Sequence, residues 1–208
     1  MSAKPKTDTD MPFFEVVEKR VSVRKYKANP VKPEHLELIL EAARQAPNAG
    51  NQQPWRFLVV QDKAILKKFR DKAWRARKKW LLDNGYEADS DDEMKAHYNN
   101  ILGAPLHVVV LVDTAVKHKG YADKDGALAA ENLMLAARAL GYGSVMITGS
   151  VSANTLREFF EIPRRYVINC LIPIGVPDSW PSKRDRRPLS EFVFKEKVPK
   201  RAPRATNT

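Results

Sequence analysis

Hydrophobic residues along this chain follow two spacings, one typical of helices and one typical of strands. Four segments repeat apolar residues every three or four positions and are predicted to be helices: 33–46, 63–80, 123–140 and 152–160. Four short, mostly apolar runs are predicted to be strands: 57–60, 108–112, 143–148 and 166–174. A short helix over 13–19 and an extended piece over 21–26 precede them. Short strands mixed with longer helices favour an α+β or α/β fold.

The segment 123–140 has the widest apolar surface. Asp123 or Asp125 is predicted to cap its start, and Gly141 to end it. From 127 to 140 the polar residues are Glu131, Asn132 and Arg138. A helix with so wide an apolar surface is expected to be buried nearly all round. We expect one side of it to pack against a second subunit, because the chain is small.

The segment 63–80 is predicted to be a basic amphipathic helix. Its apolar residues recur at a 3,4,3,4 spacing on one face: Leu66, Phe69, Ala73, Ala76 and Trp80. Trp74 lies just off this stripe and is expected to be exposed, whereas Trp80 is expected to belong to the core. The polar, acidic stretch 83–92 that follows predicts a mobile excursion.

Length and charge limit the class of protein. A chain of 208 residues with 43% hydrophobic residues is predicted to fold as one domain. Its net charge is +11, but the excess is confined to 63–80, with nine basic residues and one acidic, and to 195–208, with five and one. Such clusters suit a nucleic acid or another polyanion. Since no recognised nucleic-acid motif accompanies them, a solvated helix face is the preferred interpretation.

Several classes of site are disfavoured by what the sequence lacks. No apolar run approaches the ~20 residues that span a bilayer, and the first residues do not resemble a secretory signal, so we expect a cytoplasmic protein. The single cysteine, Cys170, and scattered histidines argue against a disulfide framework or a metal site. Cys170 is expected in the core, and His107 is expected to be a hydrogen-bonded structural residue. Residues 141–143 do not complete a dinucleotide fingerprint.

Three polar segments remain as candidates for chemistry. Alternation along an extended strand turns Arg20, Ser22 and Arg24 to one side, where two guanidiniums and a hydroxyl suit a phosphate dianion. The loop 46–55 gathers four side-chain amides, flexible backbone and a tryptophan, which suit a planar heterocycle. Residues 183–188 form a second cationic cluster. Each segment alone also has a structural explanation, as a basic strand edge, a polar turn or a solvated tail.

Taken together and in order, these segments resemble the nitroreductase family of flavin (FMN) oxidoreductases. The similarity spans about residues 13–194 and rests on seven pieces in the family's order. They are Ser22-Val-Arg24-Lys-Tyr26, the loop 46–55, Ala104-Pro105, the helix start 125–137, Leu140 to Gly149, Glu161-Ile-Pro163, and Ile174-Gly-Val-Pro177 with Arg186-Arg-Pro-Leu189. The resemblance implies an α+β fold with a central, mainly antiparallel sheet flanked by helices, assembled as an intertwined homodimer.

The resemblance also implies one FMN at each of two subunit-interface sites. The positions that match the family's binding residues are Arg20, Val21, Ser22, Arg24, Pro47, Asn48, Ala49, Asn51, Thr148, Gly149, Arg184 and Arg186. The arginines and Ser22 are implied to hold the phosphate and ribityl chain. Residues 47–49 are implied to come from the partner subunit and border the ring, with Asn51 near one ring edge and 148–149 at the other. Val21 departs from the family's usual arginine or histidine, so its contact is expected from the main chain.

The implied organisation is a flexible leader over 1–12, one FMN-binding domain over 13–194, and a basic flexible tail over 195–208. Within the domain, 63–100 is expected to form the basic helix and a lid that sets the acceptor. The implied activity passes hydride from NADH or NADPH through the flavin to an acceptor such as a nitroaromatic or quinone, by a ping-pong mechanism. No side chain is expected to act as an obligatory acid or base.

Other activities are weighed against this one. Relatives that dehalogenate iodotyrosine use a Glu, a Tyr four residues on and then a Lys in the lid, and residues 74–100 lack that spacing. The branch that breaks down flavin has a different loop before Pro54. A nucleic-acid or polyanion-binding protein remains the alternative from another class, although nucleic acid is not the expected partner. A flavin-binding protein with little turnover is the third alternative.

Overall fold

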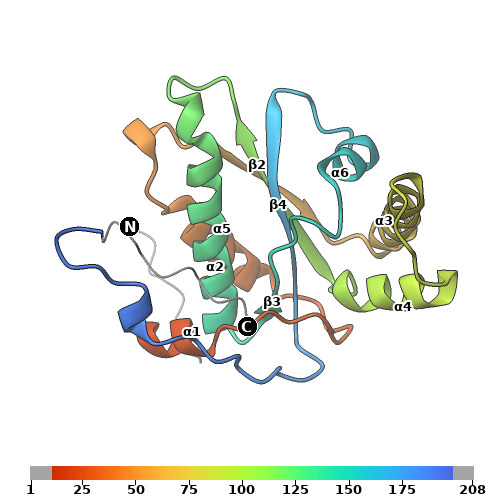
Figure 1. Cartoon of the computed structure of the whole chain (residues 1–208), viewed down its shortest axis with the longest axis horizontal. Coiled ribbons are helices and arrows are strands. Elements are labelled where there is room, and N and C mark those ends of the chain that lie inside the picture. The colour runs from red at the N-terminus through yellow and green to blue at the C-terminus, as the bar shows by residue number, and fades with distance from the viewer. Residues whose placement is uncertain (1–10, 199–208) are drawn as a thin grey trace.

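A four-stranded sheet forms the centre of the computed structural model, which describes residues 11–198 (Figure 1). Its strands are β1 (Trp55–Val60), β2 (Leu106–Asp113), β3 (Gly143–Ser144) and β4 (Tyr166–Gly175). They lie in the order β1-β2-β4-β3, and every neighbouring pair is antiparallel. The expected α+β class is confirmed. Residues 1–10 and 199–208 lie outside the described part, so the flexible leader and most of the basic tail stay predictions.

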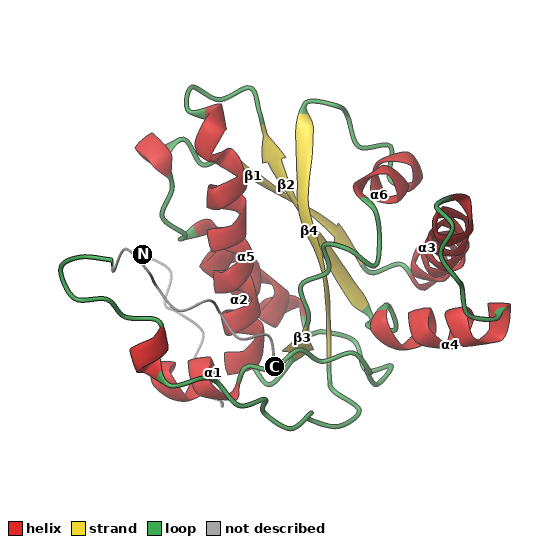
Figure 2. Ribbon diagram, in the orientation of Figure 1, coloured by secondary structure: helices red, strands yellow, loops and turns green. Residues whose placement is uncertain are grey.

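Helices cover both faces of this sheet, as Figure 2 shows. On one face lie α2 (Pro33–Arg44) and α5 (Ala122–Ala139), and on the other lie α3 (Lys63–Asp83), α4 (Asp91–Ile101) and α6 (Ala153–Phe159). The short α1 (Phe13–Lys19) packs against α5. Single 3₁₀ turns are η1 (Ala49–Asn51), η2 (Lys119–Tyr121) and η3 (Leu189–Glu191). No helix in this part of the chain is long and apolar enough to cross a membrane.

The central strand β2 is buried along its whole length because its side chains alternate between two hydrophobic cores. Val108 and Val110 belong to the core that includes Ile39 of α2 and Leu133 of α5. The intervening Val109 belongs to the opposite core, which includes Phe69 of α3 and Tyr98 of α4. Successive strand residues point to opposite faces, so a strand covered on both faces needs an unbroken apolar run.

The buried side of α3 differs from the expectation. Trp74 is 7% exposed and belongs to the core, whereas Trp80 is 46% exposed and stacks on Tyr86 with ring centroids 5.7 Å apart. Both tryptophan predictions are therefore wrong. The physical reason is α4, whose Met94 packs in the same core as Trp74 and covers the side of α3 that the 3,4 spacing left to solvent.

The helix α4 begins inside the stretch that was expected to be a mobile excursion. Ser90 caps its start: the Glu93 amide donates to Ser90 Oγ at 3.3 Å, and the Ser90 amide donates to Glu93 Oε2 at 3.0 Å. Asp91 and Asp92 add negative charge to the first turn, where the helix dipole favours it. The acidic composition therefore marks a helix start, and only 84–90 is irregular.

The predicted strand 143–148 is reduced to the two residues of β3. Gly143 pairs with Gly175, and Ile147 pairs with Leu171 in the same register, so the strand is interrupted and not displaced. In that register Val145 faces Pro173, which has no backbone N–H to donate. The proline on β4 is therefore the reason why the ladder breaks after Ser144.

The long helix α5 begins at Ala122 and ends before Gly141, whose φ of +81° suits the predicted glycine stop. No side chain caps its start, so the predicted cap by Asp123 or Asp125 is wrong. Within a single chain α5 is buried on one side, and Leu128 on the other side is 45% exposed. The expected second subunit against this helix stays a prediction.

Candidate functional site

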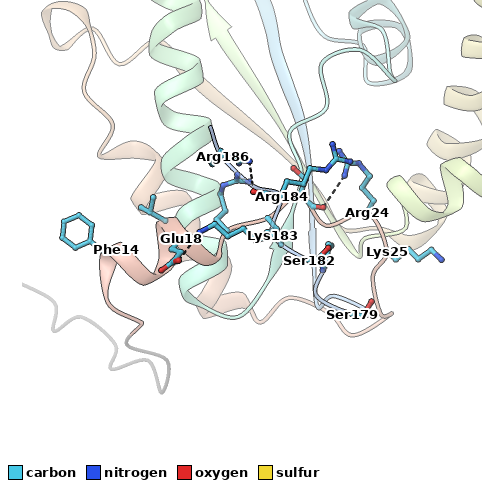
Figure 3. A pocket seen from close by; sticks show the side chains of 14 residues that line it. Phe14, Glu18, Arg24, Lys25, Ser179, Ser182, Lys183, Arg184 and Arg186 are labelled. Atoms are coloured by element: carbon cyan, nitrogen blue, oxygen red, sulfur yellow. Dashed lines mark hydrogen bonds and ion pairs between the residues drawn. The ribbon is translucent and has the colours of Figure 1, made fainter. Parts of the chain in front are cut away.

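A basic pocket of about 790 Å³ opens where the N-terminal segment 20–25 meets the segment 179–186 that follows β4. Figure 3 shows Arg24, Lys183, Arg184 and Arg186 around it. The basic side chains that line it are Arg20, Arg24, Lys25, Lys183, Arg184 and Arg186, against the single carboxylate of Glu18. Two cationic stretches that are about 160 residues apart in the sequence thus form one site.

The segment 20–25 is attached to the end of the sheet through Ser144 of β3. Val23 is fully buried, and its amide donates to the carbonyl of Ser144 at 3.0 Å. Burial of Val23 turns Ser22 and Arg24 the other way, and both line the pocket with Arg20. Val21 lines it too, half-buried. The Tyr26 hydroxyl donates to the Val23 carbonyl at 2.6 Å, and burial raises the pKa of Tyr26 well above its usual value.

The segment 179–186 is fastened across 20–25 by backbone contacts. Pro177 bridges to Tyr26, and the Asp178 amide donates to the Lys25 carbonyl at 3.1 Å. Arg138, near the end of α5, supports the same junction: its Nε donates to the Lys19 carbonyl at 3.2 Å, and its guanidinium lies 3.8 Å from the centre of the Trp180 ring. These contacts bring the arginines at both ends of the domain to one place.

The arginines of this pocket have no acidic partner. Lys183 pairs with Glu18 at 3.1 Å, but no carboxylate among residues 11–198 pairs with any of four arginines: Arg20, Arg24, Arg184 and Arg186. The side-chain contacts of Arg24 and Arg186 are to main-chain carbonyls, of Ser22 at 3.4 Å and Arg184 at 3.3 Å. Several unpaired guanidiniums around one opening form a receptor for an anion with more than one negative charge.

A second pocket of about 640 Å³ adjoins the first, and Arg24 lines both. Thr148 and Gly149 line it together with Arg77 of α3 and His97 of α4. A Cβ added at Gly149 would meet no atom within 4 Å, so the space beside the backbone there is open. Thr148 and Gly149 therefore lie within reach of the arginine pocket in the same chain.

The loop 47–51 lies at the other end of α5 from the basic pocket. Asp125 holds it there: its carboxylate accepts from the Ala49 amide at 3.3 Å and from Gln52 Nε2 at 3.1 Å. Figure 1 shows α1 beside the far end of this helix. An α-helix of 18 residues is about 27 Å long. One chain alone therefore does not bring Pro47, Asn48, Ala49 and Asn51 to the arginines.

Some residues of this site were missed or misjudged from the sequence. Asp125 serves the 49–52 loop and not the start of its own helix, and Gln52 completes the contact by accepting from the His118 amide at 2.9 Å. The sequence predicts Arg77 and His97 only as part of the segment 63–100, without a role in the site. The signal for Asp125 was its position at the start of the helix with the widest apolar surface, where a buried carboxylate needs a polar partner.

His107 and Cys170 lie in the core and are separate from both pockets. His107 is fully buried as a structural residue, and the backbone of Leu102 acts on its ring, although neither ring nitrogen has a well-aligned hydrogen bond. Burial lowers the pKa of His107 to about 3. Cys170 is buried as predicted, and burial raises its pKa to about 12. Within residues 11–198, no group of three or more His, Cys, Asp or Glu side chains is arranged to hold a metal.

Comparison with known proteins identifies the family. The Nitroreductase family profile matches residues 17–176, so the chain belongs to the nitroreductase family. A protein of Archaeoglobus fulgidus provisionally named NADH dehydrogenase/NAD(P)H nitroreductase is 33% identical over 163 residues, which cover 76% of this chain and 81% of that protein. An iodotyrosine deiodinase of Thermotoga neapolitana is 27% identical over 186 residues, covering 88% and 96%.

Solved structures agree with this assignment. The crystal structure of a provisionally named nitroreductase of Desulfovibrio desulfuricans, in complex with FMN, superposes with a TM-score of 0.70 at 26% identity, covering 92% of this chain and all of that one. The predicted resemblance and the predicted fold are confirmed. Since the family consists of oxidoreductases, the predicted class of enzyme is confirmed with them.

Proposed function

We propose that this protein is an FMN-dependent NAD(P)H oxidoreductase that acts as a homodimer and reduces a small oxidised acceptor, such as a nitroaromatic or a quinone. The observation that carries the proposal is the basic pocket, where unpaired guanidiniums from 20–24 and 184–186 surround one opening. The FMN named in the structure from Desulfovibrio desulfuricans supports the choice of ligand.

The donor set of the pocket fits the phosphate end of FMN. A phosphate dianion needs several donors that converge, and guanidiniums offer them in bidentate pairs. Ser22 adds a hydroxyl, and Val21 lines the pocket with an apolar side chain, which leaves only main-chain polar groups for a contact there. The pocket volume of about 790 Å³ lies within the roughly 300–1,000 Å³ range of small-molecule sites.

The ring end of the site requires a second copy of the chain. We assign one edge of the ring to Thr148 and Gly149, which share a pocket with Arg24. We assign the other side to the loop 47–51 of the second copy, because α5 separates this loop from the arginines of its own chain. The exposed Leu128 side of α5 is the apolar surface available for that contact.

The mechanism divides between the flavin and the chain. When bound, FMN would supply the redox chemistry, the transfer of hydride from NADH or NADPH and of electrons to the acceptor. The arginines hold the phosphate and thereby fix the position of the ring. Thr148 and Gly149 line a pocket with residues of α3 and α4. We assign this pocket to the donor and the acceptor, which would occupy it in turn. No side chain is assigned as an obligatory acid or base.

Two observations weigh against a nucleic-acid-binding protein. Trp74 is buried, so it is not available to stack on a base. Three lysines of α3 are paired with carboxylates: Lys72 with Glu158, Lys78 with Asp91 and Lys79 with Asp83. The deiodinase relative makes dehalogenation a second activity to measure.

The test is reduction of the bound flavin. Purified protein loaded with FMN is mixed without oxygen with NADH or NADPH in a stopped-flow instrument, and the flavin absorbance is followed. We expect it to bleach and then to recover when a nitroaromatic or quinone is added. Binding of FMN without bleaching would leave a flavin-binding protein with little turnover. Salt-dependent binding to DNA with no affinity for FMN would favour the nucleic-acid alternative.

A further inference from the structure

Arg77 is a cation of α3 that faces the pocket beside Thr148 and Gly149. It lines the pocket of about 640 Å³ and also a neighbouring hollow of about 450 Å³, and Thr148 and Gly149 line both as well. Its guanidinium lies 4.6 Å from the centre of the Trp80 ring, and Trp80 stacks in turn on Tyr86. Stacking on an aromatic face limits the directions in which the guanidinium can point.

No carboxylate in the described part of the chain neutralises the charge of Arg77. The two following cations are neutralised, Lys78 by Asp91 at 2.5 Å and Lys79 by Asp83 at 2.9 Å. Arg77 pairs with no carboxylate among residues 11–198, although Asp89 lines the same pocket. A half-buried guanidinium without an acidic partner is suited to bind an anionic group of a ligand.

The Tyr98 hydroxyl fastens α4 to the backbone of the site. It donates to the carbonyl of Ser150, the residue after Gly149. Burial raises the pKa of Tyr98 to about 12, and the positive charge of Arg77 opposes that rise. The charge of Arg77 therefore acts on the hydroxyl that bonds Ser150, and Arg77 lines the same pocket as the backbone 148–150.

We propose that Arg77 makes this site selective for acceptors that carry a carboxylate, of which a nitrobenzoate is the simplest, by pairing with that carboxylate. The inference rests on the proposed function, because it names the class of acceptor for the same site. Arg24 and His97 line the same pocket. The guanidinium presents parallel N–H groups that match the two carboxylate oxygens, and a lysine cannot reproduce this geometry.

Arg75 provides a matched control. It lies on the same helix, carries the same charge and also lies over a tryptophan, at 5.1 Å from the Trp74 ring centre. It lines a separate hollow with Lys78 and Lys79, and not the pockets that contain Thr148 and Gly149. Arg75→Gln and Arg77→Gln therefore remove the same charge from α3, and only the second removes it from the site.

The first measurement is binding of benzoate and of its neutral analogue benzamide to the oxidised holoenzyme, by calorimetry. We expect benzoate to bind at least about tenfold more tightly, and this preference to disappear in Arg77→Gln, to remain partly in Arg77→Lys and to be unchanged in Arg75→Gln. Neither ligand is reduced, so the result does not depend on turnover.

The second measurement is kcat/KM for 4-nitrobenzoate divided by kcat/KM for 4-nitrobenzamide. Their intrinsic reactivities cancel when the ratio is compared between wild type and variant. We expect Arg77→Gln to lower the ratio at least about tenfold through KM of the nitrobenzoate, with little change in kcat. Equal loss for both acceptors, or the same loss in Arg75→Gln, would overturn the assignment. A change only in the NADPH-to-NADH ratio would assign Arg77 to the donor and overturn it too.

The two proposals fail differently. If NADH and NADPH do not bleach the bound flavin, the proposed function is wrong. If the flavin is bleached and nitroaromatics are reduced, but benzoate binds no more tightly than benzamide, the function stands and the role of Arg77 is wrong.

Discussion

Asp125 on α5 accepts a hydrogen bond from Gln52 Nε2 at 3.1 Å, and this contact holds the loop 48–52 against the start of the long helix. The same carboxylate accepts from the Ala49 amide, and Gln52 also bonds both backbone groups of His118. The loop that is assigned to the flavin ring of the second copy is therefore positioned by a buried acid on the helix beneath it. Its geometry depends on Asp125 although Asp125 lies outside the basic pocket.

We expect Asp125→Asn to destabilise the protein by about 1–3 kcal/mol, because the amide keeps one acceptor oxygen and turns its N–H groups toward the donor of either Gln52 or Ala49. We also expect weaker FMN retention. Urea unfolding and the quenching of flavin fluorescence measure the two effects. The control is Glu131→Gln, an exposed acid on the same helix. A variant that keeps wild-type stability would show that this hydrogen-bonded carboxylate does not hold the loop.

The arginine pocket predicts that the protein distinguishes FMN from riboflavin, which lacks the phosphate. We expect Arg184→Ala to weaken FMN binding by about 10- to 100-fold, the range of one charge-assisted hydrogen bond, and to leave riboflavin binding unchanged. Arg187→Ala is the control, since Arg187 pairs with Glu191 at 3.0 Å and does not line the pocket. Titration followed by flavin fluorescence measures both ligands. Equal weakening for FMN and riboflavin would argue against a phosphate contact.

Gly143 couples the sheet to the phosphate segment. A Cβ at this position would lie 2.5 Å from Val23 Cγ2 and 2.9 Å from Pro177. Gly143→Ala is therefore expected to displace 22–24, to cost about 1–3 kcal/mol of stability and to weaken FMN binding. In Gly120→Ala, where the added Cβ meets nothing within 4 Å, we expect wild-type behaviour. Thermal unfolding and FMN titration test the pair, and an unaffected Gly143→Ala would contradict the close packing.

His107 predicts an acid-side loss of stability. Burial lowers its pKa from 6.5 to about 3 in the folded protein, so between these values the unfolded chain binds a proton that the folded chain does not. Stability then falls as pH drops below about 6.5, by up to about 1.4 kcal/mol per pH unit for this one group. We expect His107→Leu to make the free energy of unfolding depend less steeply on pH between pH 6 and 4, by an amount equivalent to at most one bound proton. Urea titrations at each pH measure this dependence. An unchanged pH dependence would mean that the pKa of His107 is not lowered in the folded protein.

The secondary structure was largely predictable where local spacing decides it. The apolar run at β2 and the periodicity of α2 and α5 predicted their elements within a few residues. The predictions were wrong where burial or strand length depends on a residue that is distant in the sequence. Trp74 is buried because α4 covers it, and β3 stops because Pro173 faces it across the ladder. Such effects are not encoded in the spacing of the segment itself.

The sequence by itself determined the chemistry of each segment. It showed which segments are apolar enough to be buried. It also showed that the arginines and the serine of 20–24, and the cationic cluster 183–188, are suited to bind an anion. Only the tertiary structure decided that these two stretches meet, because backbone contacts such as Asp178 to Lys25 fasten one across the other. It also decided that the loop 47–51 lies at the opposite end of α5, since a helix is rigid over its length and separates what it carries at its two ends.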